Sequence, residues 1–297
     1  MANLSSKTKG ILAFIGATLA GSGIPVFSKL VLREIGPEEM MTIRFLIAWL
    51  IFLPFVFRSL PKKISDWFKI SLATLPAAVN MVLFANGVQF TTASMAQLIY
   101  SLSPIAAAVI VFFIGQEKLG PRKIWGIIIG LIGMLVLILT PLRNQQLSGL
   151  IGSTQGNGLL LIGMICWTMY TIASKSLNRL FSSSVISSVL LLNGFLINFL
   201  FGGFKIFTPN ALQQISLVTW LSILYLSLIC SIAFFLLYQL AIKYTSAVTV
   251  LMMTYLQPVL TFIWAAILLG ETLNPLLIIA AGLTLAGAYL TTTAKKT

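Results

Sequence analysis

LLGETLNP, residues 268–275, places one carboxylate, Glu271, directly after a long apolar run. No charged residue occurs between Leu251 and Leu269. A second stretch, FIGQEKLGP at 113–121, places Glu117 in the same context, 154 positions earlier. Since the chain has only six acidic residues, two of them in matching surroundings indicate an internal repeat.

Shifting the sequence by 154 positions extends the match without gaps across much of each half. The aligned pairs include Pro104 with Pro258, Glu117 with Glu271, Pro121 with Pro275 and Gly133 with Gly287. At an offset of 146, SKLVLR (28–33) aligns with SKSLNR (174–179). The pattern predicts two units, residues 1–145 and 146–297, that together form one integrated transmembrane unit.

Composition places the chain in a membrane. Of the 297 residues, 58% are hydrophobic and 8% are charged, whereas soluble domains carry roughly 25% charged residues. The apolar runs have the length of about 20 residues that a helix needs to cross a bilayer. We therefore predict an all-α integral membrane protein with ten transmembrane helices, at about 10–31, 39–57, 69–88, 93–114, 123–140, 157–176, 184–203, 217–240, 246–269 and 274–292.

The distribution of lysine and arginine orients these spans. With a cytoplasmic N-terminus, fourteen of these residues fall in cytoplasmic segments and four outside, with Arg44 left inside the second span. This bias fits the positive-inside rule and predicts that both termini are cytoplasmic. Because each unit has five spans, the second unit enters the membrane inverted. Such 5+5 inverted-topology repeats are common in secondary transporters.

Several classes of function are disfavoured by the residues that are missing. The chain has no histidine and two cysteines, Cys166 and Cys230, both within apolar runs, so neither a metal site nor a disulfide framework is expected. No acid–base pair or activated nucleophile is evident, so an enzyme is disfavoured and no cofactor is expected. We attribute the net charge of +13 to loop residues rather than to nucleic-acid binding. A channel and a non-transporting receptor remain alternatives to a carrier.

Four segments resemble a known family. The repeated stretches SLSPIAAAVIVFFIGQEKL (101–119) and YLQPVLTFIWAAILLGETLNP (255–275) are similar to the signature of the drug/metabolite transporter superfamily, EamA branch. CWTMYTIASK (166–175) and TIRFLIAWL (42–50) resemble it as well. In the first span, Ala20, Gly21 and Ser22 stand where the family often has a tryptophan before a small-residue pair. The resemblance implies a ten-helix transporter that exports amino acids, metabolites or drugs across a bacterial inner membrane.

Polar residues inside the spans mark a predicted pathway, because buried polar groups in a bilayer must face protein or water. Span four has a polar helix face that includes Pro104, and span nine has one that includes Pro258. The two faces align at the 154-residue offset. The carbonyls freed by these prolines either bind water or substrate, or mark packing kinks. The aromatic candidates have a second interpretation as core or lipid-facing residues, and Tyr238 as an interfacial anchor. The predicted substrate-binding residues are Asn80, Gln97, Tyr100, Ser101, Trp167, Tyr170, Tyr238, Thr254 and Gln257, with Asn86, Thr171 and Gln239 nearby.

The charged residues near span ends are predicted to have structural or gating roles. Glu117 and Glu271 are expected to bind backbone amides or a basic side chain at the turns. For Arg44, the favoured interpretation is a side chain that reaches the interface or pairs with Glu38 or Glu39. Lys29 and Lys175, at equivalent helix ends, are interpreted in the same way.

No acidic residue or histidine lies in the middle of a span, which argues against coupling through a buried carboxylate. We therefore expect a neutral cavity that suits a zwitterionic, apolar or drug-like metabolite, and facilitated export or weakly coupled exchange. Small residues in span five (Gly126, Gly130, Gly133) and span ten (Ala280, Thr284, Gly287) allow close packing. They either join the two halves or form a homodimer. The expected partners are the substrate and the lipid bilayer.

Overall fold

A computed structural model describes residues 5–114, 120–122, 124–130, 132–133, 152–208, 212, 215–245, 250–251, 253–271 and 275–293. This part of the chain is helical and contains no strand. Its elements are α1 (Ser6–Ser22), α2 (Ile24–Val31), α3 (Pro37–Val56), η1 (Phe57–Ser59), α4 (Ile64–Gln89), α5 (Ala93–Tyr100), α6 (Ser103–Phe113), α9 (Thr154–Leu180), α10 (Ser183–Leu200), η2 (Gly203–Phe207), α11 (Leu217–Ser227), η3 (Leu228–Ala233), α12 (Phe234–Tyr244), α14 (Met253–Leu269) and α15 (Pro275–Thr293).

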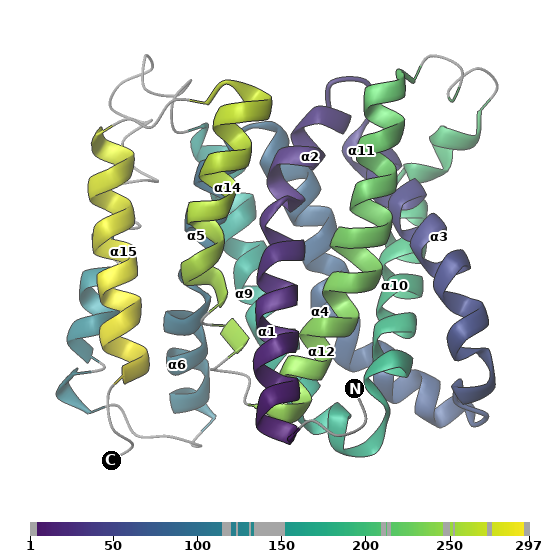
Figure 1. Cartoon of the computed structure of the whole chain (residues 1–297), viewed down its shortest axis with the longest axis horizontal. Coiled ribbons are helices and arrows are strands. Elements are labelled where there is room, and N and C mark those ends of the chain that lie inside the picture. Colours follow the sequence, from purple (N-terminus) through teal and green to yellow (C-terminus); the bar gives the residue numbers. More distant parts are fainter. Residues whose placement is uncertain are drawn as a thin grey trace.

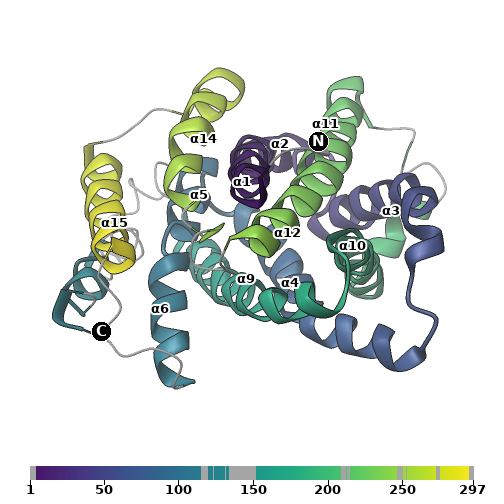
Figure 2. The ribbon, with the colours of Figure 1, turned by 60° about the horizontal axis from the view of Figure 1, so that its bottom comes forward.

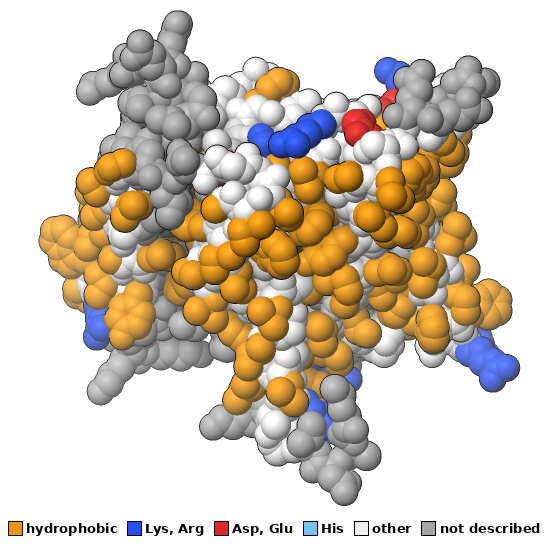
Figure 3. All heavy atoms as spheres, turned by 45° about the horizontal axis from the view of Figure 1, so that its top comes forward, with side chains coloured by type: hydrophobic (Ala, Val, Ile, Leu, Met, Phe, Trp, Pro, Cys, Tyr) orange, Lys and Arg blue, Asp and Glu red, His pale blue; other side chains and the backbone are white. Residues whose placement is uncertain are grey.

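The outside of the bundle is apolar, as expected of a multi-pass membrane protein. Seven helical stretches in the described part are long and apolar enough to cross a bilayer, and α14 is a shorter apolar helix. Phe55, Ile64 and Phe113 are 80% or more exposed, which is favourable only where lipid covers them. In Figure 3, hydrophobic side chains cover the middle of the visible face, and lysine and arginine side chains lie near its margins.

The two predicted units are not separate bodies, because their helices interleave. α4 from the first half packs along α9 from the second, α3 packs along α10, and α1 packs along α12. Figure 2 shows α1, α9 and α12 in the middle of the bundle, with α6 and α15 on one side and α3 on the other. α1 begins and α15 ends at the same edge of the bundle, the lower one in Figure 1.

Several predicted spans are broken helices. The span predicted at 10–31 is α1 and α2, which meet at Gly23, and Pro25 lies in the first turn of α2. The span predicted at 93–114 is α5 and α6, with Pro104 in the first turn of α6. Proline favours a helix start because it lacks the N–H that an interior position must donate. The equivalent proline, Pro258, instead lies inside the continuous helix α14, so the aligned prolines have different local structures.

Two sets of contacts recur at the 146- and 154-residue offsets. Lys29 Nζ donates to the carbonyls of Val88, at 3.3 Å, and of Thr91; we name this contact the Lys29 cap. Lys175 Nζ donates to the carbonyls of Ile242 at 2.8 Å, Lys243 at 3.3 Å and Thr245 at 2.6 Å, which we name the Lys175 cap. α2 lies near the upper edge of the bundle and α12 ends near the lower edge (Figure 1).

Glycines also recur at these positions and allow close helix approach. A Cβ on Gly10 would lie 3.1 Å from the Tyr244 Cβ, and a Cβ on Gly156 would lie 2.9 Å from the Phe90 Cβ. Gly10 and Gly156 differ by 146 positions, and Phe90 and Tyr244 by 154. At the far side of the bundle, Gly287 of α15 packs directly on the backbone of Gly126 and Gly130. Gly287 of span ten therefore packs on Gly126 and Gly130 of span five within the chain.

Candidate functional site

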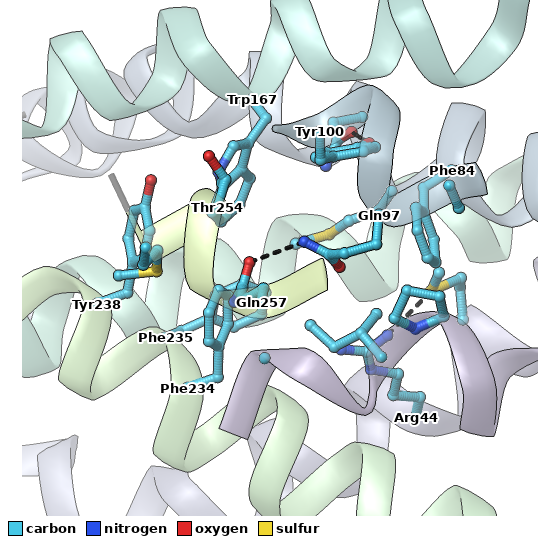
Figure 4. Close-up of a pocket in the computed structure, with 18 of the residues that line it drawn as sticks. Arg44, Phe84, Gln97, Tyr100, Trp167, Phe234, Phe235, Tyr238, Thr254 and Gln257 are labelled. Carbon is cyan, nitrogen blue, oxygen red and sulfur yellow. Dashed lines mark hydrogen bonds between the residues drawn. The ribbon is translucent and has the colours of Figure 1, made fainter. Parts of the chain in front are cut away.

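A central pocket lies where helices of both halves meet. It encloses about 690 Å³ of empty space, open solvent at its mouth included. Its wall is mostly apolar and aromatic, with polar groups at a few points (Figure 4). The lining residues are Gly21, Ile24, Pro25, Met41, Arg44, Phe45, Asn80, Met81, Phe84, Ala96, Gln97, Tyr100, Trp167, Phe234, Phe235, Tyr238, Met253, Thr254 and Gln257.

A hydrogen bond between two glutamines crosses the pocket. Gln97 Nε2, on α5, donates to Gln257 Oε1, on α14, at 3.0 Å, and both side chains are buried. Gly21 of α1 makes room for this bridge, because a Cβ there would overlap Gln257 Nε2 and lie 2.8 Å from the Phe234 ring. Each amide has further donors and acceptors, so the pair offers hydrogen-bonding groups in an otherwise apolar wall.

Aromatic rings form the wall on one side of this bridge. The Trp167 ring centroid lies 4.9 Å from that of Tyr238, 6.0 Å from that of Phe234 and 6.1 Å from that of Phe235. In Figure 4, Trp167, Tyr238 and Phe235 lie to one side of the glutamine pair, and Phe84, Tyr100 and Arg44 to the other. Rings at these spacings present flat apolar faces to a ligand.

The far wall is held by a second polar contact. The Tyr100 hydroxyl donates to Asn80 Oδ1, and the Phe84 ring meets the Tyr100 ring edge to face, with centroids 5.9 Å apart. Asn80 also lies where α4 and α9 approach closely, 2.9 Å from the position of a Cβ on Gly163. These contacts fix the rotamers on this side of the pocket.

Seven of the nine predicted substrate-binding residues line the pocket, and Ser101 and Tyr170 do not. The Ser101 hydroxyl donates to the Leu98 carbonyl at 2.6 Å, in the break between α5 and α6. Tyr170 is fully buried, and its hydroxyl accepts from Gln239 Nε2. The seven lining residues are Asn80, Gln97, Tyr100, Trp167, Tyr238, Thr254 and Gln257.

Tyr170 belongs to a buried polar cluster between α9 and α12, which we name the Gln239 network. Gln239 Nε2 donates to Tyr170 and to Ser174 Oγ at 3.2 Å, and its Oε1 accepts from Asn178 Nδ2 at 2.6 Å. Asn178 Oδ1 in turn accepts from the Ser183 hydroxyl at 2.8 Å. The network's α9 members follow the pocket residue Trp167 along the helix and lie on both sides of Lys175.

Tyr238, which lines the pocket, is not an interfacial anchor. Its side chain is 1% exposed, and its hydroxyl shares a 2.6 Å hydrogen bond with Thr171 Oγ1. Asn86, by contrast, lies away from the pocket and donates to Glu38 Oε1 at 2.7 Å.

Arg44 departs from the environment favoured by the sequence. Its side chain is 2% exposed and does not reach the interface, and its hydrogen bonds go to residues other than Glu38 and Glu39. Arg44 Nε donates to Ser231 Oγ at 2.8 Å, and Nη2 donates to the Cys230 carbonyl at 2.9 Å. Since Arg44 lines the pocket, the expectation of a cavity without a cation is wrong.

Of the two glutamates of the repeat, the structure describes the contacts of Glu271. The Glu271 carboxylate accepts from the backbone N–H groups of Ala93 at 2.7 Å and Ser94 at 3.1 Å, and from the Ser94 hydroxyl at 2.7 Å. It therefore sits at the N-terminus of α5, where the helix dipole favours negative charge. The amides belong to α5 and not to the turn that contains Glu271. Glu117 lies outside the described residues.

The carbonyl freed by Pro104 already has a partner. The Tyr100 carbonyl accepts from the Ser103 hydroxyl at 2.7 Å, so a local side chain replaces the missing backbone donor. Pro258 is buried within α14.

The structure adds lining residues that the sequence analysis did not select, notably Phe84, Phe234 and Phe235. Phe234 precedes Tyr238 by one helical turn, and this spacing could have indicated a shared face. Lys29 and Lys175 bind backbone carbonyls rather than acids. No group of three or more acidic, cysteine or histidine side chains in the described part could hold a metal ion.

Comparisons with known proteins agree with this architecture. The model of the EamA-like transporter family matches the chain in two segments, residues 8–139 and 154–293. An uncharacterized transporter of Archaeoglobus fulgidus is 28% identical over 97% of this chain and 98% of its own length. A Salmonella typhimurium protein named a probable amino-acid metabolite efflux pump is 26% identical over 67% of each chain. A solved crystal structure superposes with a TM-score of 0.68 at 18% identity, covering 96% of this chain and 97% of that chain, and shares the fold.

Proposed function

Because the chain belongs to the EamA-like transporter family, whose relatives are named as transporters and not as enzymes, we propose that it exports a small metabolite by alternating access. The transport site is the central pocket. The export crosses a bacterial inner membrane. A conformational change that opens the pocket to one side closes it to the other.

The glutamine bridge is the observation that carries this proposal. Gln97 belongs to the first half and Gln257 to the second, and they meet inside the pocket at 3.0 Å. A substrate that takes over these amide groups binds both halves at once. Alternating access requires that substrate binding changes how the two halves are arranged. A substrate that contacts both halves can do so, because its binding energy then depends on their relative position.

The proposed topology is ten spans in two inverted five-helix repeats, residues 1–145 and 146–297, with both termini cytoplasmic. The family model matches two segments that fall on either side of this boundary. The Lys29 and Lys175 caps use equivalent residues near opposite edges of the bundle. The positive-inside bias supports a cytoplasmic location for the edge at which α1 begins and α15 ends.

The proposed substrate is an amino acid or another small zwitterionic or drug-like metabolite. The aromatic wall around Trp167 suits an apolar or aromatic moiety, and the glutamine amides suit a polar group. The name of the Salmonella typhimurium relative, a probable amino-acid metabolite efflux pump, supports this class.

Counterflow tests the proposal. Candidate substrates come from untargeted metabolite profiling of cells that overproduce the protein, and each is then loaded into proteoliposomes. A carrier shows uptake of labelled substrate that is accelerated by unlabelled substrate on the opposite side, whereas a channel shows no such trans-stimulation. Uptake without trans-stimulation for every candidate would contradict alternating access.

Two variants connect that activity to the glutamine bridge. Gln97→Ala and Gln257→Ala each remove one partner of a buried hydrogen bond, so we expect roughly a tenfold rise in the half-saturation concentration. Gln89→Ala is the matched control, because Gln89 is exposed at the end of α4. Equal transport by all three variants would remove the bridge from the proposed mechanism.

A further inference from the structure

The pocket contains a buried positive charge for which the described residues supply no acidic partner. Arg44 is 2% exposed, and none of its hydrogen bonds goes to an acidic residue. A guanidinium remains protonated in proteins, and a buried charge is costly unless it is paired. Either the protein or a ligand has to offset this charge.

The protein offsets it only in part. A guanidinium has five N–H groups. In Arg44, Nε donates to Ser231 Oγ and Nη2 to the Cys230 carbonyl, and Nη1 makes a weak 3.8 Å contact with Met41 Sδ. The Phe45 ring lies 4.9 Å from the guanidinium carbon. All of these partners are neutral, and one N–H of each terminal nitrogen remains for another acceptor.

The nearest acids along the chain are already engaged elsewhere. Glu38 Oε1 accepts from Asn86 Nδ2 at 2.7 Å, and Glu39 Oε2 accepts from the Gly36 N–H at 2.8 Å. Both residues lie in the first turn of α3, where the helix dipole stabilises their negative charge. Neither of them neutralises Arg44.

The backbone holds the guanidinium in place. Cys230 and Ser231 belong to η3, a π-helical segment of six residues between α11 and α12. Such segments are rare and occur frequently at functional sites. Here η3 presents one carbonyl and one hydroxyl to Arg44, so the side chain is oriented before any ligand binds.

From these contacts we propose that Arg44 binds the carboxylate of the transported substrate, and that the substrate's apolar part lies against Trp167. This inference rests on the proposed transport function. Figure 4 shows Arg44 and Trp167 on opposite sides of the glutamine pair. A carboxylate at Arg44 accepts from the remaining N–H groups of the guanidinium, which match its geometry. The glutamine amides lie between the two ends and bind the polar groups next to the carboxylate.

Binding by the unaltered protein tests the ligand class without any mutation. The probes are L-phenylalanine, 3-phenylpropionate, L-phenylalaninamide and phenethylamine, which share a phenyl ring but differ in the carboxylate and the amine. Thermal unfolding of the purified protein is followed against the concentration of each probe, because a ligand that binds the folded state raises the melting temperature. We expect both acids to bind at least about tenfold more tightly than the amide and the amine.

Variants then assign the preference to Arg44. Arg44→Met removes the charge at similar length, and we expect it to weaken binding of both acids by about tenfold to a hundredfold while leaving the amide unchanged. Arg44→Lys retains a charge but loses the planar fork, so an intermediate loss is expected even if the methionine variant folds poorly. Arg58→Met is the control, because Arg58 is exposed in η1.

The outcomes separate this inference from the transport function. If neither acid binds, if all four probes bind equally, or if the Arg44 variants retain the preference for acids, the inference is wrong. If an amide or amine drives counterflow as well as the acids do, the inference fails while the transport function stands. If the acids bind through Arg44 but neither they nor any candidate from the metabolite profiling drives counterflow, the carboxylate site stands and the transport function fails.

Discussion

At both the Lys29 end and the Lys175 end of the bundle, a lysine binds backbone carbonyls of a neighbouring helix, but the side chains next to the two lysines differ. In each cap a lysine donates to carbonyls at the end of the partner helix, α4 at one end and α12 at the other. The last carbonyls of a helix have no partner within it, so a lysine is well suited to both positions.

Beneath the caps the equivalent positions differ. Ser28 and Ser174 are equivalent, yet Ser174 Oγ accepts from Gln239, whereas the buried Ser28 Oγ has no partner among the described residues. The position equivalent to Gln239 is Ala85, which is fully buried. Likewise, Tyr170 and Asn178 correspond to Ile24 and Leu32. Among the equivalent positions compared, the polar network is therefore present at the Lys175 end and has no counterpart at the Lys29 end.

This difference has a consequence for opening the pocket. Separating α9 from α12 exposes amide and hydroxyl groups, which water can bind in place of their present partners. Separating the helices at the Lys29 end exposes Ile24 and Leu32 and must also release Glu271 from the N-terminus of α5. We therefore expect the Lys175 end to open at the lower free-energy cost.

The largest effect should come from breaking the Gln239 network. Gln239→Leu leaves three buried polar partners, Tyr170, Ser174 and Asn178, without their acceptor or donor. Since each unsatisfied buried group costs about 1–3 kcal/mol, and some will find other partners, we expect the free energy of unfolding to fall by roughly 3 kcal/mol. Equilibrium unfolding in mixed detergent and SDS micelles measures the loss.

A triple variant makes the Lys175 end resemble the Lys29 end. Adding Tyr170→Phe and Asn178→Leu to Gln239→Leu removes most of the buried polar groups that the single substitution leaves without partners. We therefore expect at least half of the lost free energy of unfolding to be restored. A triple variant that is less stable than the single variant would show that packing, and not hydrogen bonding, dominates this region.

A smaller effect, equal at the two ends, should follow from removing the caps. Lys29→Met and Lys175→Met each leave helix-terminal carbonyls without a charged donor, and both lysines are partly exposed. We expect each to lower the free energy of unfolding by about 2 kcal/mol. Lys243→Met is the control, because that side chain is exposed and lies 5.9 Å from the Tyr244 ring. If one cap variant matches the control, the two caps are not equivalent.

Sequence patterns predicted an all-helical membrane protein, because hydropathy and the length of the apolar runs determine this class, and the described part of the chain contains seven stretches of that kind. They also selected Gln97 and Gln257, since polar groups inside a span must face protein or water. They did not predict the contacts of Arg44. Its partners are supplied by η3, and the sequence LICSIA gives no signal that separates a π-helix from an α-helix.

The lysines and prolines show the same limit. Aligned residues identified Lys29 and Lys175 as equivalent, but the partners of a lysine depend on which carbonyls lie within reach in three dimensions. Pro104 begins a helix and Pro258 lies inside one, although they align. A local sequence match therefore predicted equivalent places in the fold, while the backbone at each place depends on the neighbouring helices.

The smallest expected effect is a pH dependence confined to the Lys29 end. Glu34 lies outside the membrane spans, and hydrogen bonds from the side chain and backbone N–H of Ser216 lower its pKa below the ordinary value of 4.5. A lowered pKa means that this contact stabilises the folded state above pH 4.5 and is lost as the pH falls through the folded-state value. The equivalent position at the other end is Leu180, which is 71% exposed and does not titrate. Glu34→Gln should therefore speed hydrogen exchange at the start of α11 at pH 7, and the difference from the unaltered protein should vanish in acid. A difference that persists unchanged to pH 3 would assign the effect to side-chain shape rather than to charge.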